Sequence, residues 1–259
     1  MSMTESFVAP ERVRSEPIVY FPASTFPTVH PIDWLTSHFA VGGWSPLARL
    51  GGMLTAHMTR IAPRAGFTWH PHRGVEIYTW VLEGTLHHED STGGMGDIHA
   101  GELQRMFSGD YIEHQELNLW DEPVRVIQIW FVADLKFRGL EPHYQQLRRD
   151  ELPAARGDGS TVYSLIGGGS PVEQHMAGRL SAVSVEPGGR AVIAPPHQDE
   201  DLFLYVTDGA GQAAVHGDAV ELGQYDVILA RPDMPELALS APQGGSLDAL
   251  CFYLPGFLA

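Results

Sequence analysis

The stretch "TWHPHRGVEIYTWVLEG", from Thr68 to Gly84, carries the pattern on which the fold assignment rests. Its second part, "EIYTWVLEG", is rich in β-branched and aromatic residues and ends in a Glu-Gly turn signal, which is typical of a β-strand. Side chains at positions i and i+2 of a strand point to the same side. His70 and His72 are therefore predicted to project together. Pro71 between them removes one backbone donor, which favours an edge or bulge position.

The remainder of the chain predicts many more short strands and few helices. Glycine (28 residues) and proline (19 residues) are plentiful, which suits a fold with many turns. Strand-like segments include "MLTAHMTRI", "VRVIQIWFV", "DLFLYVTDGAGQAAVHG" and "SLDALCFYLPG". The 259 residues are enough for one large domain or for two domains of modest size.

The second half of the chain repeats the pattern of the first. A shift of 125 residues aligns Glu83-Gly84 with Asp208-Gly209 and His72 with His197. A small β domain that occurs twice predicts an all-β fold of two antiparallel β-barrels, or jelly rolls, in one chain. The same alignment places Pro195 opposite His70, so we do not expect a complete second copy of any site built on that histidine.

The repeat divides the chain into three predicted parts. Residues 1–140 form an N-terminal domain with an extended N-terminal arm, and residues 161–259 form a C-terminal domain. Residues 141–160 form a linker, in which "EPHYQQLRRDEL" predicts a short helix that begins near Pro142.

Charge and composition exclude several classes of function. The net charge of −16 is a poor match for nucleic acid or an anionic membrane, because binding to either relies on Lys and Arg. The only cysteine, Cys251, lies in an apolar run and is predicted to be a buried core residue. The chain shows no secretory signal and no apolar run of membrane-spanning length, so we expect a cytoplasmic protein.

A second pair of potential ligands follows in "GDYIEHQELN", where His114 and Glu116 again stand at i and i+2. Two strands that each offer two ligands on one face can close a mononuclear metal site. Three imidazoles and one carboxylate suit Fe(II), Mn, Ni, Cu(II) or Zn, and are unsuited to Ca or Mg. Spacing alone leaves the alternative open that these are surface residues, because the chain has 13 histidines.

Five motifs together resemble the pirin family. They are "HPHRG" at 70–74, "LEG" at 82–84, "GELQRM" at 101–106, "HQE" at 114–116 and "LKFRGLEPHYQQ" at 135–146. The resemblance implies a bicupin fold with one divalent transition metal, Fe(II), in the N-terminal barrel. It implies His70, His72, His114 and Glu116 as the ligands. The sequence departs from the family where Tyr111 replaces a usual glycine and where "VEI" stands at 75–77.

Other polar residues near these motifs receive more modest predictions. Glu76 is expected to orient a ligand imidazole from behind, and Arg73 to pair with a carboxylate or an anionic substrate. His87, His88 and His99 are expected to be exposed near the hairpin loop.

The resemblance implies two classes of function. The first is an oxidoreductase similar to quercetin 2,3-dioxygenases, which would act on a small planar phenol with Glu116 as general base. The alternative is a non-catalytic, iron-binding regulatory protein that acts through a protein partner. Fold alone does not exclude a metal-dependent sugar or keto-acid isomerase, but such a site would favour an extra lysine or acid facing the metal, and the motifs offer none beyond Glu76. We expect a monomer that binds neither nucleic acid nor membranes directly.

Overall fold

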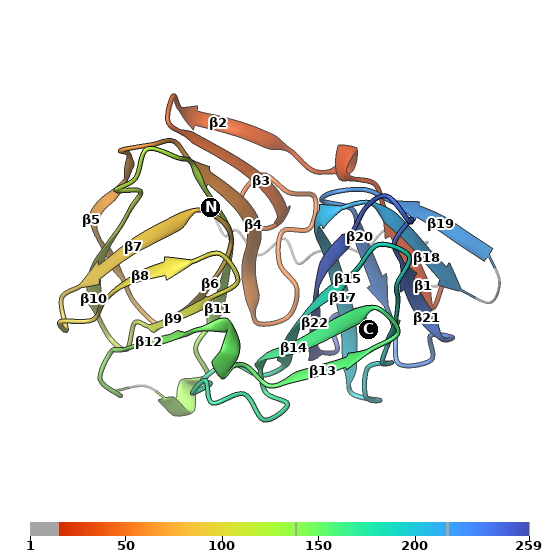
Figure 1. Ribbon diagram of the computed structural model, residues 1–259. Coiled ribbons are helices and arrows are strands. Elements are labelled where there is room, and N and C mark those ends of the chain that lie inside the picture. Colours follow the sequence, from red (N-terminus) through yellow and green to blue (C-terminus); the bar gives the residue numbers. More distant parts are fainter. Residues whose placement is uncertain (1–15, 138, 216–217, 259) are drawn as a thin grey trace.

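The structure is a computed structural model that describes residues 16–137, 139–215 and 218–258. These residues form two β-barrels side by side, and each barrel consists of one seven-stranded and one four-stranded antiparallel sheet (Figure 1). The predicted all-β class with two barrels in one chain is confirmed.

The N-terminal barrel contains the sheets β12-β9-β6-β11-β4-β3-β2 and β5-β10-β7-β8. The larger sheet comprises β12 (His143–Leu147), β9 (Leu103–Phe107), β6 (Val75–Glu83), β11 (Val124–Val132), β4 (Met53–Ile61), β3 (Leu35–Val41) and β2 (Thr28–Ile32). The smaller sheet comprises β5 (Gly66–His72), β10 (Ile112–Leu117), β7 (Thr85–Asp90) and β8 (Met95–His99).

The C-terminal barrel repeats this arrangement, with the sheets β1-β20-β17-β22-β15-β14-β13 and β16-β21-β18-β19. The larger sheet comprises β1 (Ile18–Phe21), β20 (Val227–Ala230), β17 (Glu200–Gly209), β22 (Leu247–Pro255), β15 (Arg179–Val185), β14 (Ser160–Ile166) and β13 (Ala154–Gly157). The smaller sheet comprises β16 (Arg190–Ile193), β21 (Leu237–Ser240), β18 (Gly211–Val215) and β19 (Asp218–Leu222).

The helix expected to begin near Pro142 in the 141–160 linker is not present, and the linker has only the three-residue 3-10 helix η3 (Arg149–Glu151) further along. Residues 143–147 form strand β12, which pairs with β9 so that Tyr144 lies opposite Met106. The described chain contains only three-residue 3-10 helices, namely η1 (Ala23–Thr25), η2 (Leu135–Phe137) and η3 (Arg149–Glu151). Pairing with the free edge of β9 outweighs the weak helix propensity of this segment.

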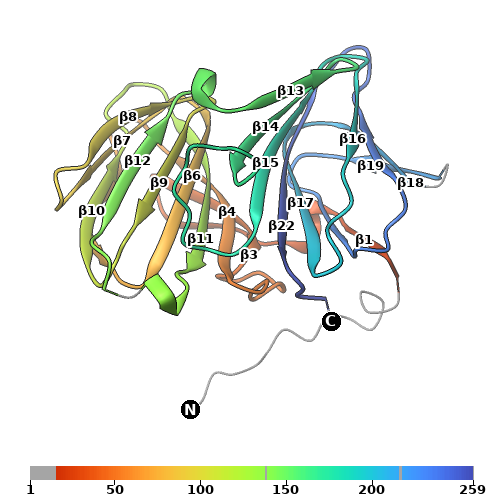
Figure 2. The ribbon, with the colours of Figure 1, turned by 90° about the horizontal axis from the view of Figure 1, so that it is seen from below.

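Each large sheet is completed by a strand from outside its own repeat. Strand β1, from the predicted arm, pairs with β20 of the C-terminal barrel, where Ile18 lies opposite Ala230. Strand β12, from the predicted linker, pairs with β9 of the N-terminal barrel (Figure 2). Residues 1–15 of the arm lie outside the described residues. The division of the chain at residues 140 and 161 stays a prediction.

The largest apolar cluster contains side chains from both seven-stranded sheets, among them Tyr78 and Phe131 from the first barrel and Phe203 and Phe252 from the second. Burying this much apolar surface holds the barrels together, at about 25 cal/mol per Å². The interior of the N-terminal barrel holds two smaller clusters instead. On β6, Ile77 belongs to one of them and Val81 to the other.

A belt of buried polar side chains separates these two clusters. Thr79 on β6 lies opposite Gln104 on β9 and opposite Gln128 on β11. All three side chains are buried. Strand alternation explains this placement, because Thr79 stands two residues from both Ile77 and Val81 and so shares their inward face.

The C-terminal barrel has no such belt at the equivalent positions. There Leu204 on β17 lies opposite Ile228 on β20 and opposite Cys251 on β22. All three are buried in one apolar cluster. Cys251 is the buried core residue that the sequence predicted, and burial raises the pKa of its thiol to about 12. At these positions the C-terminal barrel is therefore filled with apolar side chains, whereas the N-terminal barrel has polar ones.

One buried histidine outside the polar belt gives the fold a predicted pH dependence. His57 on β4 stacks on Phe39 and shares a 3.0 Å hydrogen bond with Thr55, and burial lowers its pKa to about 4. An unfolded histidine titrates near pH 6.5. The stability that neutral, folded His57 contributes is therefore complete above pH 6.5 and is lost as the pH falls toward 4.

We expect this loss to approach about 1.4 kcal/mol per pH unit. The measurement is urea denaturation of the wild type and His57→Gln at several pH values between 7 and 4.5. The wild type should show the steeper decline in unfolding free energy. Equal slopes would contradict the assignment.

Candidate metal centre

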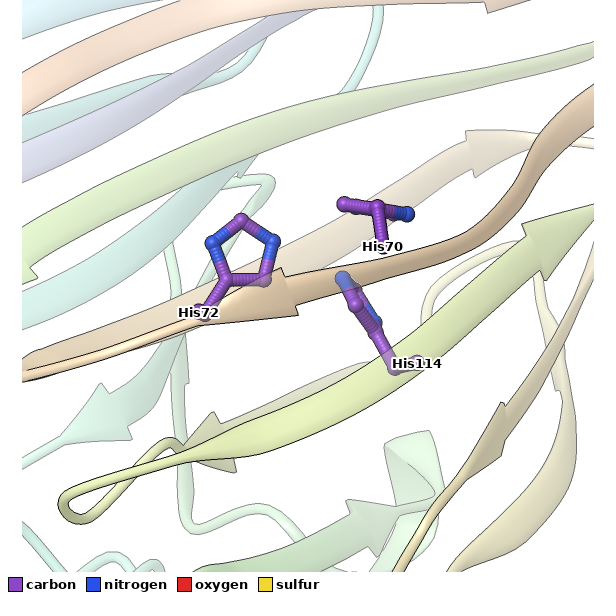
Figure 3. A group of neighbouring side chains, drawn as sticks. All are labelled: His70, His72 and His114. Carbon is purple, nitrogen blue, oxygen red and sulfur yellow. The ribbon is translucent and has the colours of Figure 1, made fainter.

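Three predicted ligands lie together on two paired strands of the small sheet. Strand β10 pairs with β5 so that His114 is directly opposite His70, while His72 is two residues along β5. The three rings turn toward one another, as Figure 3 shows. Their centroids are 4.4 Å apart for His70 and His114, and 4.9 Å apart for each pair that includes His72.

The nitrogen atoms of this triad are close enough together to bind one cation. One nitrogen from each ring lies within 4.8 Å of the other two. The Nε2 atoms of His72 and His114 are buried and have no hydrogen-bond partner among the described residues. His70 Nδ1 lies 2.8 Å from the carbonyl oxygen of Thr68, which can only accept. His70 therefore donates from Nδ1, which in the neutral ring is the tautomer with a lone pair on Nε2.

The protonation state of the triad also suits a metal. Burial, followed by the neighbouring His70 imidazole, lowers the pKa of His72 to about 4. The same causes lower the pKa of His114 to about 2. Neutral imidazole is the form that binds metals, so these two rings need not lose a proton near neutral pH.

One side of the triad is open and the other is closed. His70 and His72 are partly exposed, whereas His114 is 1% exposed. The Trp130 indole stands edge-on to His72, with the ring centroids 4.8 Å apart. Its Nε1 donates to the Oε1 of Gln128 at 3.2 Å. The site thus has solvent access beside an aromatic wall.

Glu116, the fourth predicted ligand, lies in an overlapping group with His88 and His114 and not with His70 and His72. Its Oε1 accepts from Gln104 Nε2 at 3.2 Å, and its Oε2 accepts from Gln128 Nε2 at 2.5 Å. A register shift in β5 places Phe67, rather than Thr68, opposite Glu116. This irregularity interrupts regular pairing between the two predicted ligand positions. Coordination by Glu116 stays a prediction.

Comparison with known proteins places the chain in a family. The family model described as Pirin matches residues 48–131. A protein of Mycobacterium tuberculosis named "Putative quercetin 2,3-dioxygenase" is 34% identical over 182 residues, which cover 68% of this chain and 73% of that protein. The chain belongs to the pirin family. A pirin-like protein of Solanum lycopersicum is 30% identical over 173 residues, which cover 65% of this chain and 59% of that protein.

The bicupin fold of pirins is also seen in solved structures. The bacterial pirin YhhW of Escherichia coli, solved in complex with nickel(II), superposes with a TM-score of 0.75 at 22% identity. The superposition covers 92% of this chain and 99% of YhhW. Within the part of this pirin that the structure describes, no helix is long and apolar enough to cross a membrane.

Glu76 does not orient a ligand imidazole in this pirin, contrary to the sequence-based expectation. It stands one residue from the inward-facing Ile77, so strand alternation turns it to the outer face of β6. There its buried carboxylate lies 2.7 Å from the Arg105 guanidinium and accepts from the backbone N–H of His175. Glu76 therefore belongs to an ion pair next to the second half of the chain.

The expectation that His88 is exposed is also wrong. His88 is fully buried, with its Nε2 3.1 Å from Asp90 Oδ2, and its ring stacks on Tyr144. His87 is partly exposed and His99 is exposed. The motif "HHED" holds the signal that was missed, because His88 and Asp90 stand at i and i+2 and face inward together.

Arg73 and Tyr111 lie together at the surface. The Arg73 guanidinium is 4.2 Å from the centroid of the Tyr111 ring, and it donates to the backbone oxygen of Asp110 at 3.0 Å. The Tyr111 hydroxyl donates to Glu113 at 2.5 Å. Among the described residues Arg73 therefore contacts a ring and a backbone carbonyl rather than the expected carboxylate, and its alternative role toward an anionic substrate stays a prediction.

Proposed function

We propose that this pirin is a metal-dependent dioxygenase that acts on flavonol-like, quercetin-type substrates or other enediol-like phenols. The proposal rests on the convergence of three imidazoles with two unpartnered Nε2 atoms at a partly open site. The names of curated relatives support this reaction class.

The proposed ligands are His70, His72, His114 and Glu116, and the proposed metal is Fe(II). Imidazole nitrogen and carboxylate oxygen suit Fe(II), and also Mn, Ni, Cu or Zn. The metal, when bound, would polarise the substrate hydroxyl and carbonyl oxygens, lower the pKa of the hydroxyl and supply the redox chemistry with dioxygen.

Two parts of the chain would act on the substrate directly. Glu116 would accept the hydroxyl proton, since each of its oxygens has two lone pairs and an amide of Gln104 or Gln128 occupies only one. Trp130 would form one wall for a planar ring. Gln128 connects the two residues, because its Oε1 accepts from Trp130 while its Nε2 donates to Glu116.

The proposed reaction is balanced with dioxygen as the only co-substrate. Two carbon–carbon bonds of the flavonol heterocycle break, and carbon monoxide leaves with the oxygen of the former hydroxyl. The ester product keeps both atoms of dioxygen, and the hydroxyl proton ends on its new carboxyl group. Carbon monoxide is therefore a specific product to measure.

The decisive experiment loads the protein with Fe(II) without oxygen and then adds quercetin and air. We expect the flavonol absorption band to fade with release of an equal amount of carbon monoxide. His30→Ala is the control for replacing a histidine outside the site and should turn over quercetin like the wild type. His30 is exposed on β2, at the far edge of the large sheet. Stoichiometric iron binding without turnover of quercetin or a related phenol would overturn the proposal and favour the regulatory alternative.

Glu116→Gln tests the general-base role. The substitution preserves the shape of the side chain but removes its ability to take up a proton. We expect it to lower kcat by about 10²–10⁴-fold while the protein retains measurable metal binding. Glu89→Gln on β7 is the control, because Glu89 is partly exposed and accepts a hydrogen bond from Gln115 at 2.8 Å. Turnover at the wild-type rate in Glu116→Gln would rule out the role.

A further inference from the structure

We propose that Asp90 and His88 are positioning residues that hold His114 in the tautomer whose Nε2 lone pair points at His70 and His72. The inference rests on the metal site proposed above. It is carried by a chain of hydrogen bonds that runs through the barrel interior from Asp90 to His88 to His114.

The series of hydrogen bonds begins at the Asp90 carboxylate, whose two oxygens have different partners. Asp90 Oδ1 accepts from the Thr92 backbone N–H at 2.8 Å, from the Thr92 hydroxyl at 2.6 Å and from the Gly94 N–H at 3.0 Å. Asp90 Oδ2 lies 3.1 Å from His88 Nε2, and both side chains are fully buried. A carboxylate can only accept, so His88 carries its hydrogen on Nε2.

The next link joins the His88 ring, which carries its hydrogen on Nε2, to the His114 ring. With hydrogen on Nε2, the Nδ1 of His88 has a lone pair, and this atom lies 3.4 Å from Nδ1 of His114. His114 therefore donates from Nδ1 and leaves Nε2 without hydrogen. That Nε2 is the buried atom with no partner among the described residues. Tyr144 on β12 fixes the plane of the His88 ring by stacking on it, at 4.5 Å between centroids and 11° between planes.

The arrangement matters for metal affinity because a metal binds only the unprotonated nitrogen of an imidazole. Groups that hold the other nitrogen of a ligand histidine set its tautomer and orientation, and their loss typically lowers metal affinity by about 10–100-fold. His88 and Asp90 stand in that relation to His114. The Thr68 carbonyl does the same for His70 through its Nδ1.

Asp90→Asn is the sharpest test, because the surroundings decide how the new amide lies. Thr92 and Gly94 present three donors, which hold the amide oxygen at the Oδ1 position and turn the NH2 group toward His88. The direction of every hydrogen bond between residue 90, His88 and His114 is then reversed. His88 accepts at Nε2 and donates from Nδ1, so that His114 carries its hydrogen on Nε2, facing the other two histidines.

Two readouts follow the change. Long-range ¹H–¹⁵N spectra of the metal-free protein should show His114 protonated at Nδ1 in the wild type and at Nε2 in Asp90→Asn. Titration calorimetry with Ni(II) should show about 10–100-fold weaker binding in the variant. Asp97→Asn is the matched control, because Asp97 makes a similar 2.7 Å contact to His87 and is not part of the relay, the hydrogen-bonded series of Asp90, His88 and His114. It should leave both readouts unchanged.

A second variant covers the case in which Asp90→Asn fails to fold. His88→Phe keeps a ring to stack on Tyr144 but removes the acceptor for His114. We expect a mixture of His114 tautomers and about tenfold weaker Ni(II) binding. Protonation of His114 at Nε2 in the wild type, or unchanged tautomer and affinity in the variants, would overturn the relay. Absence of Ni(II) binding in the wild type would instead overturn the metal site, while the spectra would still decide the relay.

Discussion

Replacing His70 by alanine is expected to remove nearly all of the metal affinity while the fold stays intact. His70 stands opposite His114 across the β5–β10 pair and supplies one of the three converging nitrogens. Loss of a residue that only supports a ligand costs about 10–100-fold in affinity, so loss of a ligand should exceed about a hundredfold. Dioxygenase turnover should fall below detection with it.

The measurement is calorimetric titration of His70→Ala and wild type with Ni(II), followed by the quercetin assay after loading with Fe(II). His70 is partly exposed, so its removal leaves no closed cavity and the variant should unfold at nearly the wild-type urea concentration. His99→Ala, at an exposed site on β8 at the opposite edge of the small sheet, should bind Ni(II) normally. Wild-type affinity in His70→Ala would exclude His70 as a ligand.

Strand alternation predicted which histidines share a face within each strand, and the resemblance to pirins joined the two strands into one site. The period-two rule applied to "HPH" and "HQE" placed His70 on the same face as His72, and His114 on the same face as Glu116; the structure brings the three histidines together. The rule gave less for Glu116, because it assumes regular pairing. The register shift between His114 and Glu116 is a property of the β5–β10 pair, and no single strand reveals it.

The residues that the sequence did not reveal depend on contacts between distant segments. Gln104 and Gln128 reach Glu116 only because β9 and β11 flank β6 in the sheet. Proximity in sequence was misleading for Glu76, which is close to His72 in the chain but lies on the outer face of β6, away from the barrel interior. Its partners, Arg105 and His175, stand 29 and 99 residues away along the chain.

Arg105→Met is expected to lower the unfolding free energy by about 3–5 kcal/mol, because it leaves the Glu76 carboxylate buried without its partner. Both side chains are completely buried, and the guanidinium contacts Glu76 at 2.7 Å. Arg105 Nη2 also donates to His175 Nδ1 at 2.7 Å, and Nη1 lies 3.5 Å from Glu173. The cation thus connects β6 and β9 to a segment of the second half of the chain.

Urea denaturation of a double-mutant cycle separates the ion pair from the volume of the side chains. In Glu76→Gln/Arg105→Met the uncompensated charge is gone, so most of the lost stability should return, although neither side chain regains its partner. Arg64→Met is the surface control: Arg64 pairs with Asp121 at 2.9 Å, but both are largely exposed, and such pairs contribute at most about 1 kcal/mol. The stability of Arg105→Met should therefore fall well below that of Arg64→Met. Equal losses in the two variants would mean that the buried pair orients the chain without stabilising it.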